Sequence, residues 1–164
     1  MKTFVAPRIH AAVIAATLLA APSLAFAQSA PFAGLAGVWS GSGAIALGDG
    51  HKERIKCRAT YAVSESGTGL QQTLRCASDS YRFELSSDLR SVGGGHIEGT
   101  WNEATRNVGG AIEGLAHGGV FQVVVSSPAF TANLTLTTHG NSQTVRISSQ
   151  GSEFSGVTIT LGRS

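Results

Sequence analysis

Apolar and polar side chains alternate along most of the chain beyond residue 38. In the run 55–63, apolar residues take every other position, and Lys56, Arg58 and Thr60 stand between them. Since neighbouring side chains of a strand point to opposite faces, a period of two predicts strands with one buried face. Such runs lie around residues 39–47, 55–63, 70–76, 81–85, 97–101, 108–112, 121–125, 130–137, 145–147 and 157–161.

The segments between these runs carry residues that hairpin turns prefer, for example at 66–67, 138–141 and 150–152. A succession of strands that are each apolar on one face and polar on the other suits a single sheet closing on itself. We therefore predict an all-β fold, a calycin-like antiparallel up-and-down β-barrel of about 8–10 strands. Only residues 31–35 are expected to form a turn of helix, packed across one barrel end.

Two cysteines, Cys57 and Cys76, lie 19 residues apart. A hairpin that turns at residues 66–67 places Cys57 opposite Cys76 and Tyr61 opposite Gln72. The apolar residues of both strands then share the inward face, and a slip of one residue would turn half of them outward. Directly opposite residues at a non-hydrogen-bonded site have Cα atoms about 4.5 Å apart, which a disulfide can bridge. We predict this disulfide rather than a redox or metal site, because the chain has no CxxC motif.

The same register places basic side chains on the outer face. Arg58 faces Arg75, and if the next turn pairs Cys76 with Tyr81, Arg75 faces Arg82. Like charges directly opposite each other are unfavourable unless something offsets them. The row formed by Arg58, Arg75 and Arg82 is therefore either a surface site for an anionic lipid, a glycan or an acidic partner, or an ordinary solvated exterior.

Large aromatic or polar residues are also expected on the inward faces. An amide in a core needs hydrogen-bond partners, and the two tyrosine hydroxyls are candidates to supply them to Gln72. The set indicates either a small-ligand cavity, apolar with a few converging polar groups, or a filled core. Inward glycines such as Gly41 and Gly43 fit both interpretations, because they leave room or let strands coil. The candidate interior residues are Trp39, Tyr61, Gln72, Tyr81 and Trp101.

Signals for catalysis and metal binding are weak. Ser40 lies on a predicted strand and not on a nucleophile elbow. Glu98 and Glu113 are placed on the outer face, which disfavours a pair of carboxylates acting as acid and base. We therefore expect no metal site, no cofactor and no enzymatic activity. The histidines after residue 30 also lack metal-ligand spacing; they are His51, His96, His117 and His139.

The first 27 residues have the pattern of a bacterial Sec-type signal peptide. Lys2 and Arg8 lead into an apolar run, and residues 25–27 have the small-x-small form of a cleavage site. The run is shorter than the ~20 residues of a membrane-spanning helix. Residues 28–164 are then one β-barrel domain in the periplasm or outside the cell. Of the 12 basic and 10 acidic residues, two basic ones leave with the signal, so charge does not favour nucleic acid.

The segment Gly37-Val38-Trp39, at the start of the first predicted strand, resembles the Gly-x-Trp motif of the calycins, the group of lipocalins and avidins. The resemblance implies an up-and-down barrel over most of the mature chain. It also implies a basic residue, late in the barrel, that packs on the tryptophan, and Arg163 is the late candidate. No biotin-site pattern of the avidins carries over.

Two further resemblances concern exported bacterial proteins. Small barrels that inhibit secreted metalloproteases are similar in size and in having one disulfide, which implies inhibition through a mobile N-terminal segment, here residues 28–33. The run Leu74-Arg75-Cys76-Ala77-Ser78 resembles part of an uncharacterised exported alphaproteobacterial family and implies no mechanism.

These observations favour an exported, periplasmic, non-enzymatic β-barrel that binds a partner. The ligand is either a small apolar molecule inside the barrel or an anionic lipid or glycan at the arginines. Two alternatives remain: a periplasmic protease inhibitor acting through its N-terminal segment, and a small barrel enzyme whose pocket is bordered by Gln72, Tyr61 and Tyr81. The oligomeric state stays open.

Overall fold

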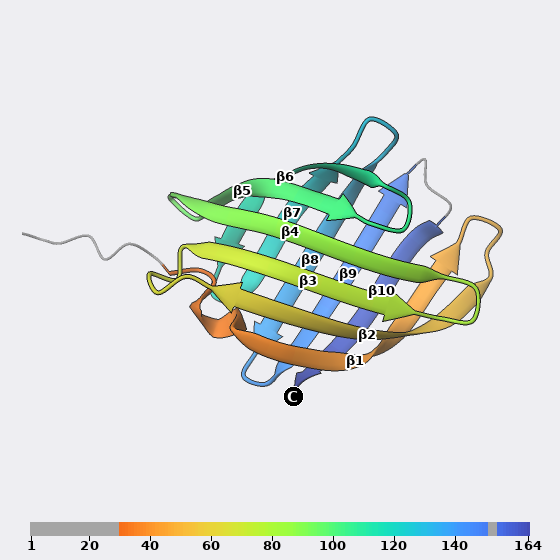
Figure 1. The fold of residues 1–164 in the computed structure, drawn as a ribbon, viewed down its shortest axis with the longest axis horizontal. Helices are drawn as coiled ribbons and strands as arrows, with labels where there is room; N and C mark the ends of the chain where they lie inside the picture. The colour runs from red at the N-terminus through yellow and green to blue at the C-terminus, as the bar shows by residue number, and fades with distance from the viewer. Residues whose placement is uncertain (1–29, 151–153) are drawn as a thin grey trace, which may run out of the picture.

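The computed structural model describes residues 30–150 and 154–164. Within these residues, ten antiparallel strands form one closed barrel, in which sequence neighbours pair and β1 pairs with β10 (Figure 1). The predicted all-β up-and-down barrel is therefore confirmed. The elements are η1 (Ala33–Leu35), β1 (Gly37–Leu47), β2 (Lys52–Val63), β3 (Gly69–Ala77), β4 (Arg82–Gly93), β5 (His96–Glu103), β6 (Val108–His117), β7 (Val120–Ser126), β8 (Thr131–His139), β9 (Ser142–Gln150) and β10 (Phe154–Arg163).

The predicted signal peptide, residues 1–27, lies outside the described residues. In the part of the chain that the structure describes, no helix has the length and hydropathy needed to cross a bilayer.

The two sets of alternating residues in the sequence form the inner and the outer surface of the barrel wall. Along β2, Ile55, Cys57, Ala59 and Tyr61 are buried, and the residues between them are exposed. Because each strand contributes its apolar residues to the same side of the sheet, the inward side chains of the ten strands form a single core.

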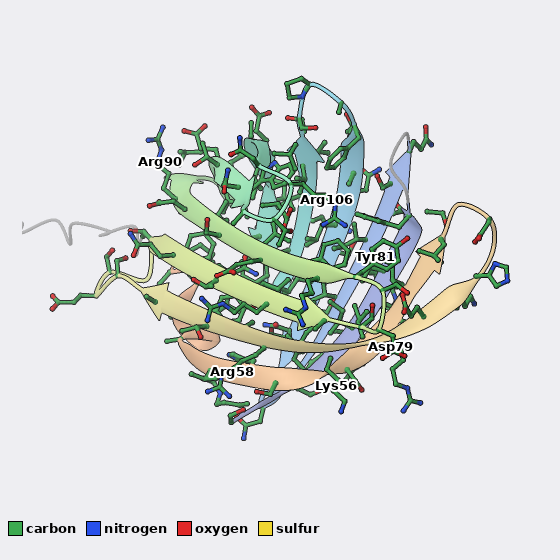
Figure 2. The ribbon with its side chains drawn as sticks, turned by 45° about the vertical axis from the view of Figure 1, so that its right-hand side comes forward. Lys56, Arg58, Asp79, Tyr81, Arg90 and Arg106 are labelled. Atoms are coloured by element: carbon green, nitrogen blue, oxygen red, sulfur yellow. A yellow bond between two sulfur atoms is a disulfide. The ribbon has the colours of Figure 1, made fainter. Side chains whose placement is uncertain are left out.

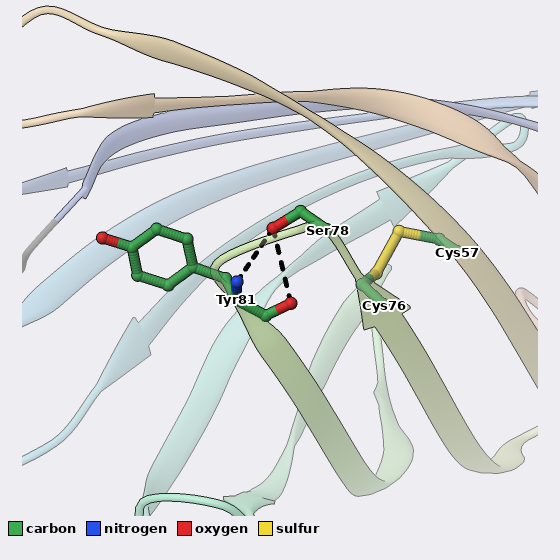
Figure 3. Close-up of a disulfide and its surroundings, with 4 residues drawn as sticks. All are labelled: Cys57, Cys76, Ser78 and Tyr81. Atoms are coloured by element: carbon green, nitrogen blue, oxygen red, sulfur yellow. Dashed lines mark hydrogen bonds between the residues drawn. A yellow bond between two sulfur atoms is a disulfide. The ribbon is translucent and has the colours of Figure 1, made fainter.

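The β2–β3 hairpin has the predicted register. Cys57 lies opposite Cys76, Tyr61 opposite Gln72, and Val63 opposite Leu70. Cys57 and Cys76 form the predicted disulfide, with their Cα atoms 4.1 Å apart (Figure 3). The bond crosses the inward face of the hairpin and fixes β2 against β3.

The β3–β4 register differs from the prediction. Cys76 lies opposite Phe83 and not opposite Tyr81, so that Arg75 faces Glu84. The reason is a wider turn: the backbone N–H of Ser78 donates to the carbonyl of Tyr81 at 2.8 Å. The Ser78 hydroxyl also accepts from the Tyr81 N–H at 2.9 Å (Figure 3). Residues 78–81 therefore form the turn, and Tyr81 precedes β4.

One end of the barrel, here called the capped end, is covered by η1 and the residue before it. Phe32 and Trp39 are both fully buried there. The Phe32 ring stacks on that of Phe121 at 5.9 Å, and the Trp39 indole N–H donates to the carbonyl of Leu35 at 2.8 Å. The expected turn of helix across one barrel end is thus confirmed. Ala30 to Ala33, the described part of the predicted mobile segment, is docked, because Phe32 belongs to the core.

Arg163, at the end of β10, fastens the cap to the barrel. Its guanidinium lies 4.3 Å from the centre of the Trp39 ring, which is the contact that the calycin resemblance implies. It also donates to the carbonyls of Gly34, at 2.7 Å, and Ala36. Gly37 follows with φ +116°, a conformation that side chains rarely adopt, so the glycine of Gly-x-Trp turns the chain from the cap into β1.

The inward glycines of β1 provide close contact between strands and not empty space. A Cβ atom added to Gly41 or Gly43 would lie 2.0 Å from the carbonyl oxygen of Thr160 or Thr158 on β10. The interpretation in which these glycines let the strands coil is therefore the one that the geometry supports.

Candidate functional site

A cavity of about 200 Å³ occupies the barrel interior between the capped end and the opposite end. Residues of β3 to β10 form much of its wall, and most of the side chains around it are apolar. The barrel is therefore not completely filled by its own side chains. Representative wall residues are Leu74, Leu85, Ile112, Val123, Leu134 and Ile147.

Aromatic rings surround the cavity at the end opposite the cap, which we call the aromatic end. Phe83, Phe130 and Phe154 line the cavity there and are each half-buried. Phe83 and Phe154 meet edge to face with centroids 5.5 Å apart. Trp101 lies 5.8 Å from Phe130 and donates its indole N–H to the carbonyl of Ser126 at 3.1 Å.

A buried carboxylate, Glu103, also lines the aromatic end and is 3% exposed. It accepts hydrogen bonds from the backbone N–H groups of Glu84, Thr105 and Arg106, at 3.0, 3.2 and 2.8 Å. Burial opposes its ionisation, but these donors and the Thr105 hydroxyl outweigh that effect and lower the pKa of Glu103. The Arg106 guanidinium lies 3.7 Å from the carboxylate and 4.9 Å from the centre of the Phe83 ring. Glu103 is thus an ionised group that holds the β5–β6 turn against β4.

Three of the five predicted interior residues lie on one row of the wall. Tyr61 on β2 is opposite Gln72 on β3, Gln72 is opposite Ser87 on β4, and Ser87 is opposite Trp101 on β5. All four line the cavity. The row places the polar side chains of Tyr61, Gln72 and Ser87 on a wall that is mainly apolar.

The hydrogen bonds within this row differ from those expected. The Ser87 hydroxyl, not a tyrosine, donates to Gln72 Oε1 at 2.9 Å. The Tyr61 hydroxyl donates instead to Gln143 Oε1 at 2.8 Å, and Gln143 is fully buried. Burial raises the pKa of Tyr61, while its bond to Gln143 acts in the opposite, weaker sense.

The other two predicted residues lie apart from the cavity. Trp39 is buried under the cap, against Arg163. Tyr81 lies in the β3–β4 turn (Figures 2 and 3) and is half-buried. Its ring stacks on that of Phe83, with the centroids 6.2 Å apart. The expectation that Tyr81 points into the barrel beside Gln72 is wrong, because the wider turn removes it from the strand.

Sequence reasoning did not place Gln143, Glu103 and Phe154 at the interior site. The period of two through Val145 and Ile147 extends back to Gln143, so a signal for its inward position was present. For Glu103 the alternation from Trp101 gives the same signal. Ser149, on the same face of β9 as Gln143, also lines the cavity, and its hydroxyl has no hydrogen-bond partner in the described residues.

The predicted row of three arginines across the outer face is not formed. Arg58 does face Arg75, and Figure 2 shows Arg58 pointing away from the barrel. However, Arg75 binds Glu84 of β4, with N–O distances of 3.0 and 2.7 Å, and Arg82 lies opposite Ala77. A cross-strand ion pair therefore stands where the prediction placed a third arginine.

Groups for metal binding do not converge in the described residues. Among residues 30–150 and 154–164, no three or more His, Cys, Asp or Glu side chains are placed to hold a metal ion. Glu98 and Glu113 face each other on the outer side of the barrel, and Glu98 is paired with Arg90.

Comparison with solved structures finds the same barrel in other proteins. The S-type phycobiliprotein lyase CPES from Guillardia theta matches with a TM-score of 0.60 and 10% identity, over 81% of this chain and 90% of that one. Rv2717c from M. tuberculosis matches with a TM-score of 0.61 and 14% identity, over 80% and 94%. EF1p2_mFAP2b, solved with DFHBI bound, matches with a TM-score of 0.50 and 12% identity, over 83% and 100%. No protein-family model and no curated protein sequence matches the chain.

These likenesses establish the fold, and they correct one expectation. A barrel of this fold carries the name of a lyase, so the fold class does not support the prediction that the protein is not an enzyme. That prediction, which was drawn from the weak catalytic signals in the sequence, is therefore wrong. The calycin-like architecture agrees with the solved barrels, while the identities of 10–14% leave the family of this chain unassigned.

Proposed function

We propose that the protein binds a small apolar molecule inside its barrel. The observation that carries the proposal is the cavity of about 200 Å³ in a wall of mainly apolar side chains. Transfer of an apolar molecule from water into such a space is favourable, and an apolar cavity of about 150 Å³ is enough to bind benzene. The ligand enters at the aromatic end, because η1 and Phe32 cover the other end.

The half-buried rings at the aromatic end support this route. Phe83, Phe130 and Phe154 combine apolar surface with partial exposure, so they offer a flat contact to an aromatic or alicyclic ligand as it passes. Glu103 and Arg106 beside them already contact each other and the backbone. The first contacts of the ligand at this end are therefore apolar.

We propose in addition that the protein is exported and works in an oxidising compartment. The Cys57–Cys76 disulfide supports this, because such bonds persist outside the reducing cytosol. The experiment is fractionation of the producing cells, followed by mass measurement of the mature chain. A chain that begins at Gln28, recovered from the periplasm or the medium, is the expected result; an uncleaved chain in the cytosol would contradict it.

A pair of neighbouring valines tests the interior site. Val123 lines the cavity, whereas Val124, the next residue of β7, is 44% exposed on the outside. Val123→Phe places a ring in the cavity, and we expect it to weaken binding of the probe indane about tenfold or more, which is about 1.4 kcal/mol. Val124→Phe adds the same ring to the outer face and is expected to leave binding unchanged.

Titration calorimetry measures the dissociation constant of indane for the natural protein and for the two variants. Thermal unfolding shows whether both variants keep the fold. One indane per chain, weakened by Val123→Phe alone, is the result expected. Absence of binding to the natural protein, or an equal loss in both variants, would contradict an interior site.

A further inference from the structure

The side-chain amide of Gln72 has an unused hydrogen-bond donor inside the barrel. Its oxygen accepts from the Ser87 hydroxyl at 2.9 Å, and no acceptor among the described residues binds its nitrogen. An amide –NH₂ group carries two N–H donors. Buried polar groups are nearly always paired, and Gln72 is half-buried on the cavity wall. The Gln72 amide nitrogen is therefore a group whose partner the described chain does not supply.

The neighbours of Gln72 explain why its nitrogen is left without an acceptor. Across the row on one side, the Tyr61 hydroxyl is directed to Gln143. On the other side, the Ser87 hydroxyl donates its hydrogen bond to the Gln72 oxygen. The inward positions above and below the row, on β3 and β4, are all leucines that line the cavity, namely Leu70, Leu74, Leu85 and Leu89. The four leucines have no acceptor to offer, and the Ser87 hydroxyl contacts the Gln72 oxygen and not its nitrogen.

We propose that the interior selects apolar molecules that carry a carbonyl-type acceptor, and that the Gln72 amide N–H donates to that oxygen. This inference rests on the proposed function, since it names the ligand class of the same cavity. The apolar wall takes the hydrocarbon body, and Gln72 takes the single polar atom. A hydrocarbon without an acceptor leaves the amide unpaired, so specificity arises from the cost of that unpaired donor.

Two probes of nearly the same shape isolate the hydrogen bond. Indane and 1-indanone differ only by one carbonyl group, and calorimetry gives the dissociation constant of each. Because the ketone is better solvated in water than the hydrocarbon, the informative quantity is the ratio of the two constants, compared between variants. We expect Gln72→Leu to reduce the preference for 1-indanone about fivefold, as expected for one neutral hydrogen bond.

The adjacent residue gives a matched control. Gln71 lies on the outer face of β3, exposed, with its amide 3.4 Å from Asp88. Gln71→Leu makes the same chemical change one position along the strand, and the ratio of the two constants is expected to stay as in the natural protein. A change in both variants alike would overturn the assignment to Gln72.

A measurement on the natural protein removes the dependence on a folded variant. The side-chain NH₂ signals of Gln72 in a ¹⁵N–¹H spectrum are identified by their loss in Gln72→Leu or by sequential assignment. They are expected to move downfield with 1-indanone and to move little with indane.

The outcomes separate this inference from the proposed function. If indane does not bind, the interior site itself fails. If both bind, but Gln72→Leu leaves the ratio unchanged and the amide signals respond equally to both probes, cavity binding stands and the acceptor selectivity is overturned.

Discussion

Tyr61 illustrates how the surroundings of one residue decide its chemistry. Its hydroxyl is buried and donates to Gln143 Oε1. Burial raises the pKa of Tyr61 above the usual value of a tyrosine, because the charged phenolate is poorly solvated in the barrel. At neutral pH the side chain is therefore a fixed hydrogen-bond donor on the cavity wall and not a base.

Replacing Tyr61 tests this role. In the unfolded chain the tyrosine ionises near pH 10, while in the folded protein its pKa is higher. As pH rises above about 10, the unfolded state loses the proton first, so the free energy of unfolding falls by up to about 1.4 kcal/mol per pH unit. Tyr61→Phe is expected to be about 1–3 kcal/mol less stable at pH 7, since Gln143 loses its donor.

Urea unfolding of both proteins at several pH values between about 9 and 11 measures the effect, because these values span the tyrosine pKa of the unfolded chain. The natural protein should lose more stability than Tyr61→Phe over this interval. Parallel curves would show that Tyr61 titrates alike in the folded and unfolded states.

The inward orientation of single residues could be predicted from sequence, but their partners could not. Alternation placed Tyr61, Gln72 and Trp101 on the inner wall, where they lie. The partner of Tyr61 is 82 residues away on β9, and nothing local indicates which inward residues of distant strands meet. The assignment of Gln72 to tyrosine partners was wrong for this reason.

At the level of elements, the β2–β3 hairpin was predictable because two independent constraints agree. The apolar faces of both strands fix the parity of the register, and the cysteines fix which pair lies opposite. The β3–β4 hairpin had only the first constraint. Its observed register differs by two residues, which keeps every side chain on its expected face, so alternation could not detect the wider turn at Ser78 to Tyr81.

Reduction of the disulfide tests the contribution of the β2–β3 link. The bond joins residues 19 apart in sequence, and a closed loop of about that length corresponds to about 3 kcal/mol in the chain-entropy treatment. Guanidinium unfolding with and without reductant is expected to show a loss of that order. The double variant Cys57→Ala/Cys76→Ala is the control, because it should not respond to reductant. Equal midpoints for the oxidised and reduced natural protein would contradict a stabilising link.

At the scale of the whole molecule, the sequence predicted the closed barrel but not whether it is hollow. Every strand shows one apolar face, which is enough to specify a closed sheet. The free volume inside depends on the number and tilt of the strands and on the packing of all inward side chains at once. The cap of Phe32, η1 and Trp39 fills one end, and the cavity of about 200 Å³ lies beyond it.

The most direct test of interior binding is a nuclear Overhauser measurement between bound indane and the methyl groups of the protein. We predict contacts from indane to Val123 and Leu134, which line the cavity, and none to Val124, which is exposed on the other face of β7. Such a pattern places the ligand inside the barrel. Contacts confined to outward methyl groups, or no contacts at saturating indane, would contradict the proposal that this protein holds its ligand in the barrel interior.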